Sequence, residues 1–171
     1  GGISIGAHKR GQAVDVNNAL DGEGPMSPER SGTLPVGDLV RLCYSGRFTL
    51  QEMMQMIKGR GGLMAHLGTT DTREVQQMVQ TGNGKAELVF RALAYQVAKS
   101  ICALTAVFSS KPDAIVLTGG MAHSELLTGW IKERVGFLAP VLVYPGEGEM
   151  EALAQGALRV LNQEEKPQVY T

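Results

Sequence analysis

Residues 115–124 read IVLTGGMAHS, and this stretch decides the class of fold. Its apolar start is typical of a short buried strand, and the two glycines lead into a helix-forming segment. A strand that passes through glycines into a helix is the repeating unit of α/β proteins, whose ligands lie at the carboxyl ends of strands. Gly119 and Gly120 are therefore candidate contacts for a phosphate or a flat ring, although a tight turn alone would also require glycine.

The segments around this unit supply the rest of the predicted sheet and its helices. Residues 3–7 and 13–16 alternate apolar and polar side chains about a Lys-Arg-Gly turn, which predicts a β-hairpin. Apolar residues three and four positions apart predict helices over 85–108 and 150–161, with a second buried strand within 139–148. The expected fold is α/β, with a mixed sheet that is opened by the hairpin and flanked by helices.

A glycine- and proline-rich loop separates the hairpin from the first helix. It covers residues 17–38, and loops of this length in a compact domain are usually functional. A short third strand is an option near Met26–Glu29, and a helix is expected over Val36–Tyr44. Two further helix starts are marked by capping patterns, which are Thr49 with Glu52 and Asp71 with Glu74.

Length and charge limit the functions that the chain can have. Its 171 residues suffice for one domain with a proper core, and its formal net charge of −1 is spread along the chain. That balance gives no electrostatic argument for nucleic acid or an anionic membrane, and no apolar run approaches the ~20 residues of a membrane span. Cys43 and Cys102 lie in apolar helical segments without metal-site spacing, which favours buried thiols in a reducing compartment.

Two glycines and one arginine have the chemistry of a phosphate site. Gly1 and Gly2 adjoin a strand, and a second glycine-rich turn beside the one at 119–120 is typical of a nucleotide cleft. Arg30 lies in the sequence SPERSG, where a guanidinium held between proline and glycine can bind a carboxylate or phosphate in two places. A solvated loop arginine is the alternative interpretation.

Charged residues at two helix starts complete the candidates. Asp71 and Arg73 could contact a sugar or a base, yet Asp71 is equally well explained as an N-cap. Acidic residues that could hold Mg²⁺, or merely satisfy the helix dipole, are Glu147, Glu149 and Glu151. The residues alone therefore indicate a nucleotide- or phosphate-handling α/β domain.

Five motifs in order resemble the C-terminal half of butyrate kinases, in the acetate and butyrate kinase family of the actin-like ATPase superfamily. GGISIGAH (1–8) resembles the family's second phosphate segment, which His-Leu-Gly normally precedes. The loop VDVNNALDGEGPMSPERSGTLPVGDL (14–39) is particularly close to butyrate kinases. LGTTDTREV (67–75) resembles the nucleotide-contacting segment, and IVLTGGMAHS (115–124) resembles the adenosine motif. MEALAQGALRV (150–160) resembles the second connecting helix.

The resemblance implies an actin-like ATPase domain and a kinase reaction. The full enzyme would transfer the γ-phosphoryl group of ATP, with Mg²⁺, to butyrate or another short-chain carboxylate, giving ADP and an acyl phosphate. Arg30 aligns with the family's catalytic arginine, and Glu149 with the acid that helps to hold Mg²⁺, with Glu147 and Glu151 as alternatives. The residues expected near ATP or ADP are Gly1, Gly2, Asp71, Arg73, Gly119, Gly120, Met121 and Ala122.

The resemblance also implies a domain organisation, partners and a location. Residues 1–162 would form the C-terminal nucleotide-binding domain of a two-domain kinase, without its N-terminal domain, and residues 163–171 a polar tail. Such domains pair in the family, so we expect a cytoplasmic homodimer without nucleic-acid or membrane partners. The alternative is a non-catalytic ATP-binding module of the same superfamily, which would need neither Arg30 nor the acidic cluster around Glu149.

Overall fold

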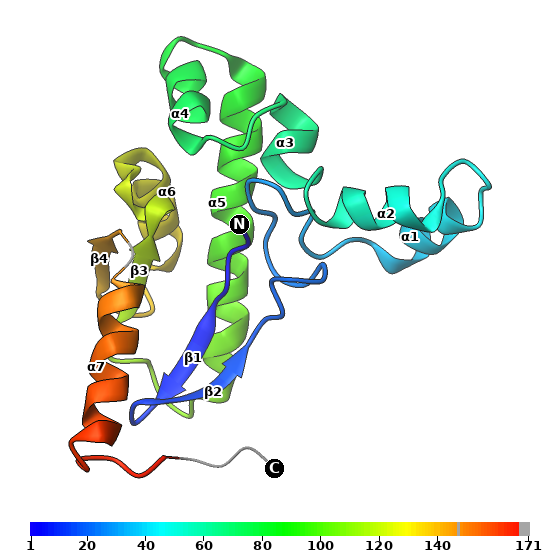
Figure 1. The fold of residues 1–171 in the computed structure, drawn as a ribbon. Helices are drawn as coiled ribbons and strands as arrows, with labels where there is room; N and C mark the ends of the chain where they lie inside the picture. Colours follow the sequence, from blue (N-terminus) through cyan, green and yellow to red (C-terminus); the bar gives the residue numbers. More distant parts are fainter. Residues whose placement is uncertain (147, 168–171) are drawn as a thin grey trace.

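The computed structural model describes residues 1–146 and 148–167. Its helices and strands are, in order, β1 (Gly6–Lys9), β2 (Gln12–Val16), α1 (Val36–Cys43), α2 (Leu50–Ile57), α3 (Gly62–Leu67), α4 (Thr72–Gln80), α5 (Gly84–Leu104), the 3₁₀ turn η1 (Thr105–Val107), β3 (Ile115–Gly119), the 3₁₀ turn η2 (Gly120–His123), α6 (Glu125–Val135), β4 (Val141–Pro145) and α7 (Glu149–Leu161). The long helix α5 runs through the middle of the molecule, and the helices α1 and α2 form an arm that projects from it (Figure 1).

Two separate two-stranded sheets stand where one mixed sheet is expected. Strands β1 and β2 pair antiparallel around a turn in which Arg10 and Gly11 have φ angles of 53° and 77°. Strands β3 and β4 pair in parallel, from Ile115 opposite Val141 onward. Among the described residues no strand pairing joins the two sheets, so the prediction of a single mixed sheet is wrong for this chain.

Main-chain groups beside the hairpin and in the loop that follows it make hydrogen bonds outside the two sheets. The Ile5 N–H, which adjoins β1, donates to Asn17 Oδ1 at 2.5 Å instead of to a strand. The Met26 N–H donates to the side-chain oxygen of Gln96 on α5 at 2.7 Å. The residues expected as a third strand near Met26–Glu29 are therefore a loop packed on α5.

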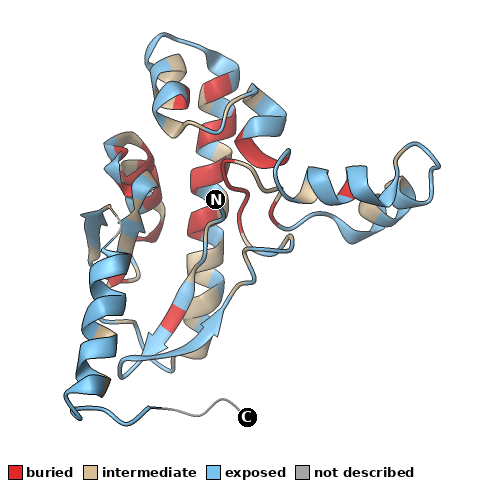
Figure 2. Ribbon diagram, viewed as in Figure 1, coloured by how far each residue is buried: buried red, intermediate tan, exposed pale blue. Residues whose placement is uncertain are grey.

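The core forms where α5 meets its neighbouring helices. Seven residues of α5 are buried: Ala86, Val89, Phe90, Leu93, Ala94, Val97 and Ala98. Phe90 packs edge-on against Trp130 of α6, with ring centroids 5.9 Å apart. The segment Gly84–Val107 is long and apolar enough to cross a membrane, yet one side of it packs in this core (Figure 2). The helix predicted over 85–108 ends at Leu104, where η1 takes over.

The predicted helix caps form fully at α2 and partly at α4. Thr49 Oγ1 accepts from the Glu52 N–H at 3.3 Å, and the Glu52 carboxylate accepts from the Thr49 N–H at 2.7 Å. This second bond lowers the pKa of Glu52. Asp71 caps α4, but the side chain of Glu74 accepts from Thr69 Oγ1 at 2.6 Å instead of closing a capping box.

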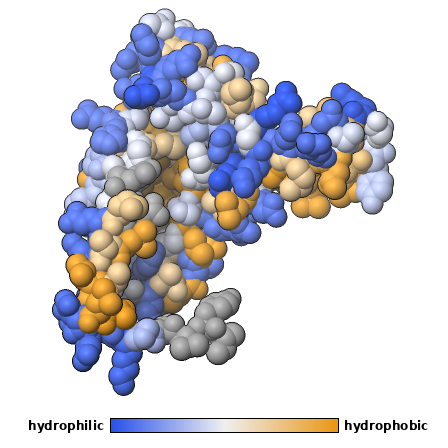
Figure 3. Space-filling model, in the orientation of Figure 1, coloured by the Kyte–Doolittle hydropathy of each residue, from blue (hydrophilic) through white to orange (hydrophobic). Residues whose placement is uncertain are grey.

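Apolar side chains remain exposed on α7 and on the α1–α2 arm (Figure 3). Met150 and Leu161 on α7 are 79% and 76% exposed, and Leu50 on α2 is 80% exposed. The apolar face predicted for the last helix therefore exists, but the described part of the chain leaves it uncovered. Cys43 is also exposed and Cys102 is half-buried, so the expectation of two buried thiols is wrong.

Candidate functional site

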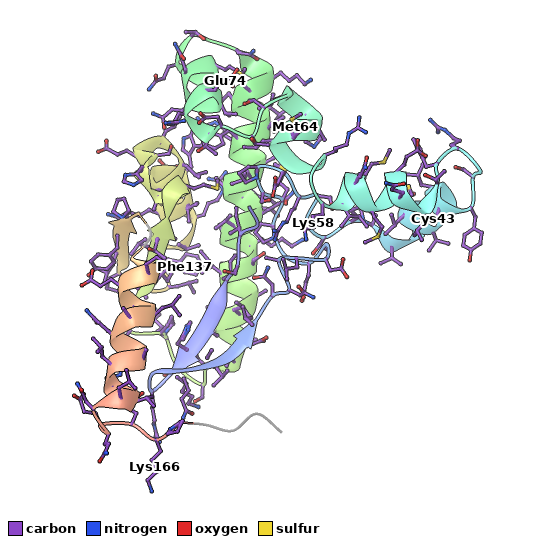
Figure 4. All side chains as sticks on the ribbon, viewed as in Figure 1. Cys43, Lys58, Met64, Glu74, Phe137 and Lys166 are labelled. Atoms are coloured by element: carbon purple, nitrogen blue, oxygen red, sulfur yellow. The ribbon has the colours of Figure 1, made fainter. Side chains whose placement is uncertain are left out.

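Main-chain hydrogen bonds hold the loop that carries Arg30 against the start of α3. The Glu29 carbonyl oxygen accepts from the N–H groups of Gly59 and Gly61, at 2.7 and 3.1 Å. Further bonds run from the N–H of Ser31 to the carbonyl of Ile57 (3.0 Å), from Leu63 to Ser27 (3.1 Å) and from Met64 to Pro28 (2.9 Å). Figure 4 labels Lys58 and Met64 at this junction. The position of the Arg30 loop is therefore determined mainly by main-chain groups.

Gly62 allows the loop and α3 to approach this closely. Its φ angle of 57° lies in the left-handed region, which L side chains rarely adopt. A Cβ at this position would overlap the Ser27 carbonyl oxygen. Ser27 is fully buried, and its hydroxyl accepts from the Arg30 N–H at 3.2 Å. Any side chain at position 62 would thus push against the residue that orients the Arg30 main chain.

The Arg30 guanidinium lies against Gly2, so the structure brings two predicted site residues together. Arg30 Nη1 donates to the Ala19 carbonyl oxygen at 2.6 Å, while Nε is buried without a hydrogen-bond partner among the described residues. A Cβ on Gly2 would overlap the guanidinium, whereas one on Gly1 would meet no atom within 4 Å. Because Nε is out of reach, an anionic ligand group beside Gly2 would be bound by the charge and the other donors of the guanidinium.

A second cluster surrounds a pocket of about 130 Å³ between α4 and the start of α6. The residues that line it are Thr72, Arg73, Gln76, Gly120, His123 and Ser124. A Cβ on Gly119 or Gly120 would meet no atom within 4 Å, which leaves room for a flat group over the main chain. Met121 packs against the core and Ala122 is buried, so a ligand would reach these two predicted contacts mainly through their main chain.

Asp71 and Arg73 form an ion pair at the edge of this pocket. Arg73 Nε donates to Asp71 Oδ1 at 3.0 Å, and Nη2 donates to Oδ2 at 2.6 Å. Asp71 also accepts from the Arg73 N–H at 2.9 Å, so the capping role and the charged contact coexist. These bonds to Arg73 lower the pKa of Asp71 from 3.8 to about 2. The pair therefore places a guanidinium at the pocket, already oriented by its neighbour.

We expect Asp71 to stay ionised well below the pH at which an ordinary aspartate takes up a proton. Because the folded pKa is depressed, the pair stabilises the fold above pH 3.8, and this contribution is lost as the pH falls from 3.8 through about 2. Carboxyl NMR signals followed against pH in the full-length protein measure the midpoint. Arg73→Ala should raise it, whereas Arg91→Ala, which breaks a separate pair with Glu87, should not. A wild-type midpoint near 3.8 would contradict the expectation.

The acidic cluster predicted to serve Mg²⁺ lies largely outside the described residues. Glu147 is not among them, and Glu149 begins α7 without a described side chain. Glu151 accepts from Gln155 Nε2 at 3.1 Å. Within residues 1–146 and 148–167 no group of three or more His, Cys, Asp or Glu side chains is placed to hold a metal ion. The metal role of Glu149 therefore stays a prediction.

The sequence analysis does not identify three of the residues that line the pocket: Thr72, Gln76 and Ser124. Ser124 caps α6 by accepting from the Leu127 N–H at 3.2 Å, and a serine before an apolar helical run is a recognisable signal for this role. Gln76 has no such signal, because its partner Ser124 lies 48 residues further along the chain.

Comparison with known proteins shows the fold and the family of this chain. The fold matches acetate kinase from Porphyromonas gingivalis (TM-score 0.83, 23% identity, 94% of this chain and 47% of that chain). It also matches acetate kinase from Entamoeba histolytica (0.80, 17%, 92% and 49%) and a propionate kinase from Francisella tularensis subsp. tularensis SCHU S4 (0.77, 22%, 87% and 44%). This chain thus spans about half the length of each of these structures. The acetokinase family matches residues 1–130, so the chain belongs to the acetokinase family.

Proposed function

We propose that this chain is the nucleotide-binding half of an ATP-dependent carboxylate kinase, with butyrate as the acceptor. The bond from the γ-phosphorus to the β–γ bridging oxygen breaks, and a bond to a carboxylate oxygen forms, which leaves ADP and an acyl phosphate. The observation that carries the proposal is the half-buried Arg30, whose guanidinium lies against Gly2. Transfer between two anions requires fixed positive charge around the reacting oxygens rather than a base. The choice of butyrate is supported by the loop over 14–39.

Each cluster of the candidate site has a separate part in this proposal. Gly1, Gly2 and the Arg30 guanidinium would face the phosphates, and the pocket beside Gly120 would hold the adenosine, with Arg73 at its edge. Mg²⁺, when bound, neutralises charge on the phosphate oxygens. Mg²⁺ prefers carboxylate ligands, and the sequence has several carboxylates around the start of α7. The residue proposed to hold Mg²⁺ is Glu149, with Glu147 and Glu151 as alternatives.

The competing proposal is an ATP-binding module of the same superfamily without catalysis. Such a module would need the adenosine pocket but would not need an arginine held beside the phosphate segment. The test is ATP-dependent formation of acyl phosphate, trapped with hydroxylamine, by the full-length protein with acids of two to six carbons. The highest kcat/KM for butyrate supports the proposal, and ATP binding without acyl phosphate supports the module. The 171-residue chain alone should show no turnover, because it spans only half the length of the kinases it matches.

We further propose that two copies of the protein pair through this domain, with the exposed apolar side chains of the α1–α2 arm in the contact. Leu50 and Val36 are 80% and 72% exposed, and a two-fold contact is the commonest way to cover such a surface. Light scattering on a dilution series should give a single dimer mass into the low micromolar range. Leu50→Asp should shift it toward the monomer, whereas Gln51→Asp adds the same charge at a polar position and should not. A monomer in the wild type, or a drifting mass, would contradict the pairing.

The proposed location is the cytoplasm. Cys43 is exposed and Cys102 half-buried, and both are free thiols. Accessible free thiols persist in a reducing compartment, where disulfides are rare.

A further inference from the structure

A side-chain hydrogen bond crosses the pocket between α4 and the start of α6. Ser124 Oγ lies 2.5 Å from Gln76 Oε1, and both residues line the pocket. The bond links residues 48 positions apart in the chain, one on α4 and the other the N-cap of α6. It therefore fixes the amide of Gln76 with respect to Gly120 and the other walls of the pocket.

Ser124 bonds to the oxygen of the Gln76 amide and also caps α6. Its hydroxyl oxygen accepts from the Leu127 N–H at 3.2 Å, as the N-cap of α6. The single hydroxyl proton remains for donation, and the side-chain oxygen of Gln76 receives it. Ser124 is only 8% exposed, so water has little access to compete for this proton. The amide oxygen of Gln76 is thus occupied by the protein.

The other end of the Gln76 amide remains available to a ligand. Within the described part of the chain, Nε2 has no hydrogen-bond partner, and it is not among the buried polar atoms that lack one. Gln76 follows Val75, which is fully buried, so the helix that carries the amide is anchored in the core. The pocket therefore presents a fixed N–H donor pair next to the open main chain of Gly119 and Gly120.

We propose that Gln76 selects the base of the bound nucleotide, by donating from Nε2 to a ring nitrogen of a purine that lies over Gly119 and Gly120. Ser124 is a positioning residue, which holds the amide so that its donors and not its oxygen face the base. This inference rests on the proposed function, since it requires a nucleotide in the pocket. A flat ring fits because neither glycine carries a side chain there, and ring nitrogens are acceptors that an amide N–H can recognise.

The test is equilibrium binding by calorimetry, with the full-length protein, of ATP and its 1-deaza, 3-deaza and 7-deaza analogues. Each analogue replaces one ring nitrogen by carbon. One neutral hydrogen bond corresponds to an affinity change of about tenfold, so one analogue should bind the wild type about tenfold more weakly than ATP. Gln76→Glu keeps an acceptor for the Ser124 hydroxyl but loses the donor. It should weaken ATP binding and abolish the difference between ATP and that analogue.

Control variants separate the amide from general damage. Gln77→Glu, at the next and exposed position of α4, should leave the difference between ATP and the analogue at about tenfold. Ser124→Ala should reduce it, and Ser124→Thr, which retains a capping hydroxyl, should restore most of it.

Three results would overturn the assignment. Equal binding of ATP and every deaza analogue by the wild type would refute the role of Gln76 while leaving nucleotide binding intact. If 2′-deoxy-ATP or 3′-deoxy-ATP, measured in the same way, bound more weakly while the three deaza analogues bound like ATP, the amide would contact the sugar and not the base. No nucleotide binding by the wild type would refute the proposed function itself, and this inference with it.

Discussion

Replacing Arg30 with alanine in the full-length protein is expected to lower kcat for the proposed acyl phosphate formation by about 100-fold or more, with a much smaller rise in the KM for ATP. The guanidinium is held by the Ala19 carbonyl and lies against Gly2, with Nε buried and unpartnered among the described residues. A donor fixed in this way interacts most strongly with charge that develops during transfer, so its loss should act on the chemical step.

The control for this variant is Arg60→Ala. Arg60 lies between Gly59 and Gly61, which contact the loop, but it is exposed. Among the described residues its guanidinium donates only to the side chain of Gln55, at 3.4 Å. It should leave kcat unchanged within about twofold, as surface changes usually do. If Arg30→Ala raised KM while kcat stayed constant, Arg30 would serve ground-state binding of ATP, and the transition-state role would be wrong.

Gly62→Ala should be the most destabilising single methyl addition among these sites, lowering the free energy of unfolding by about 3 kcal/mol or more. The left-handed backbone at φ 57° disfavours any side chain by about 1–2 kcal/mol. The new methyl would also overlap the buried Ser27 carbonyl, and overpacking of this kind costs about 1–3 kcal/mol. Urea unfolding of the full-length protein, followed by circular dichroism, measures the change.

Gly129→Ala provides the opposite expectation on the same protein. Gly129 lies inside α6, and a Cβ there would meet no atom within 4 Å. Because alanine forms helices better than glycine, this variant should gain up to about 1 kcal/mol. An unchanged unfolding midpoint for Gly62→Ala would mean that the Arg30 loop and α3 can separate without cost. The main-chain hydrogen bonds between them would then hold the Arg30 loop only weakly.

The elements that the sequence predicts well are those whose signals are local. The Thr49 and Glu52 pair forms its capping box, and the apolar spacing along α5 matches the residues that are buried in the core. The predicted strand forms as β3 and ends at Gly119, and Gly120 lines a pocket. Each of these features depends on residues within one or two turns of one another, so a pattern in the chain contains them.

The features that the sequence does not predict depend on distant partners. The segment near Met26 has the composition of a strand or a loop, and the decision comes from Gln96, which is 70 residues away and accepts its N–H. In the same way, nothing near Gln76 indicates that Ser124 will hold its amide. Resemblance of motifs indicated the family and the region of the site, but the partners of each polar group required coordinates.

The way the Arg30 loop is fastened has a consequence for evolutionary drift. The bonds from Gly59, Gly61, Leu63 and Met64 to the loop all join main-chain atoms, which every residue type other than proline provides as donors. Side chains such as Glu29, Lys58 and Arg60 can therefore be exchanged over generations while the arginine keeps its position. Substitution is limited instead at positions where there is no room for a Cβ. A lineage could in this way lose most of its recognisable identity in this region and still retain the shape of the loop.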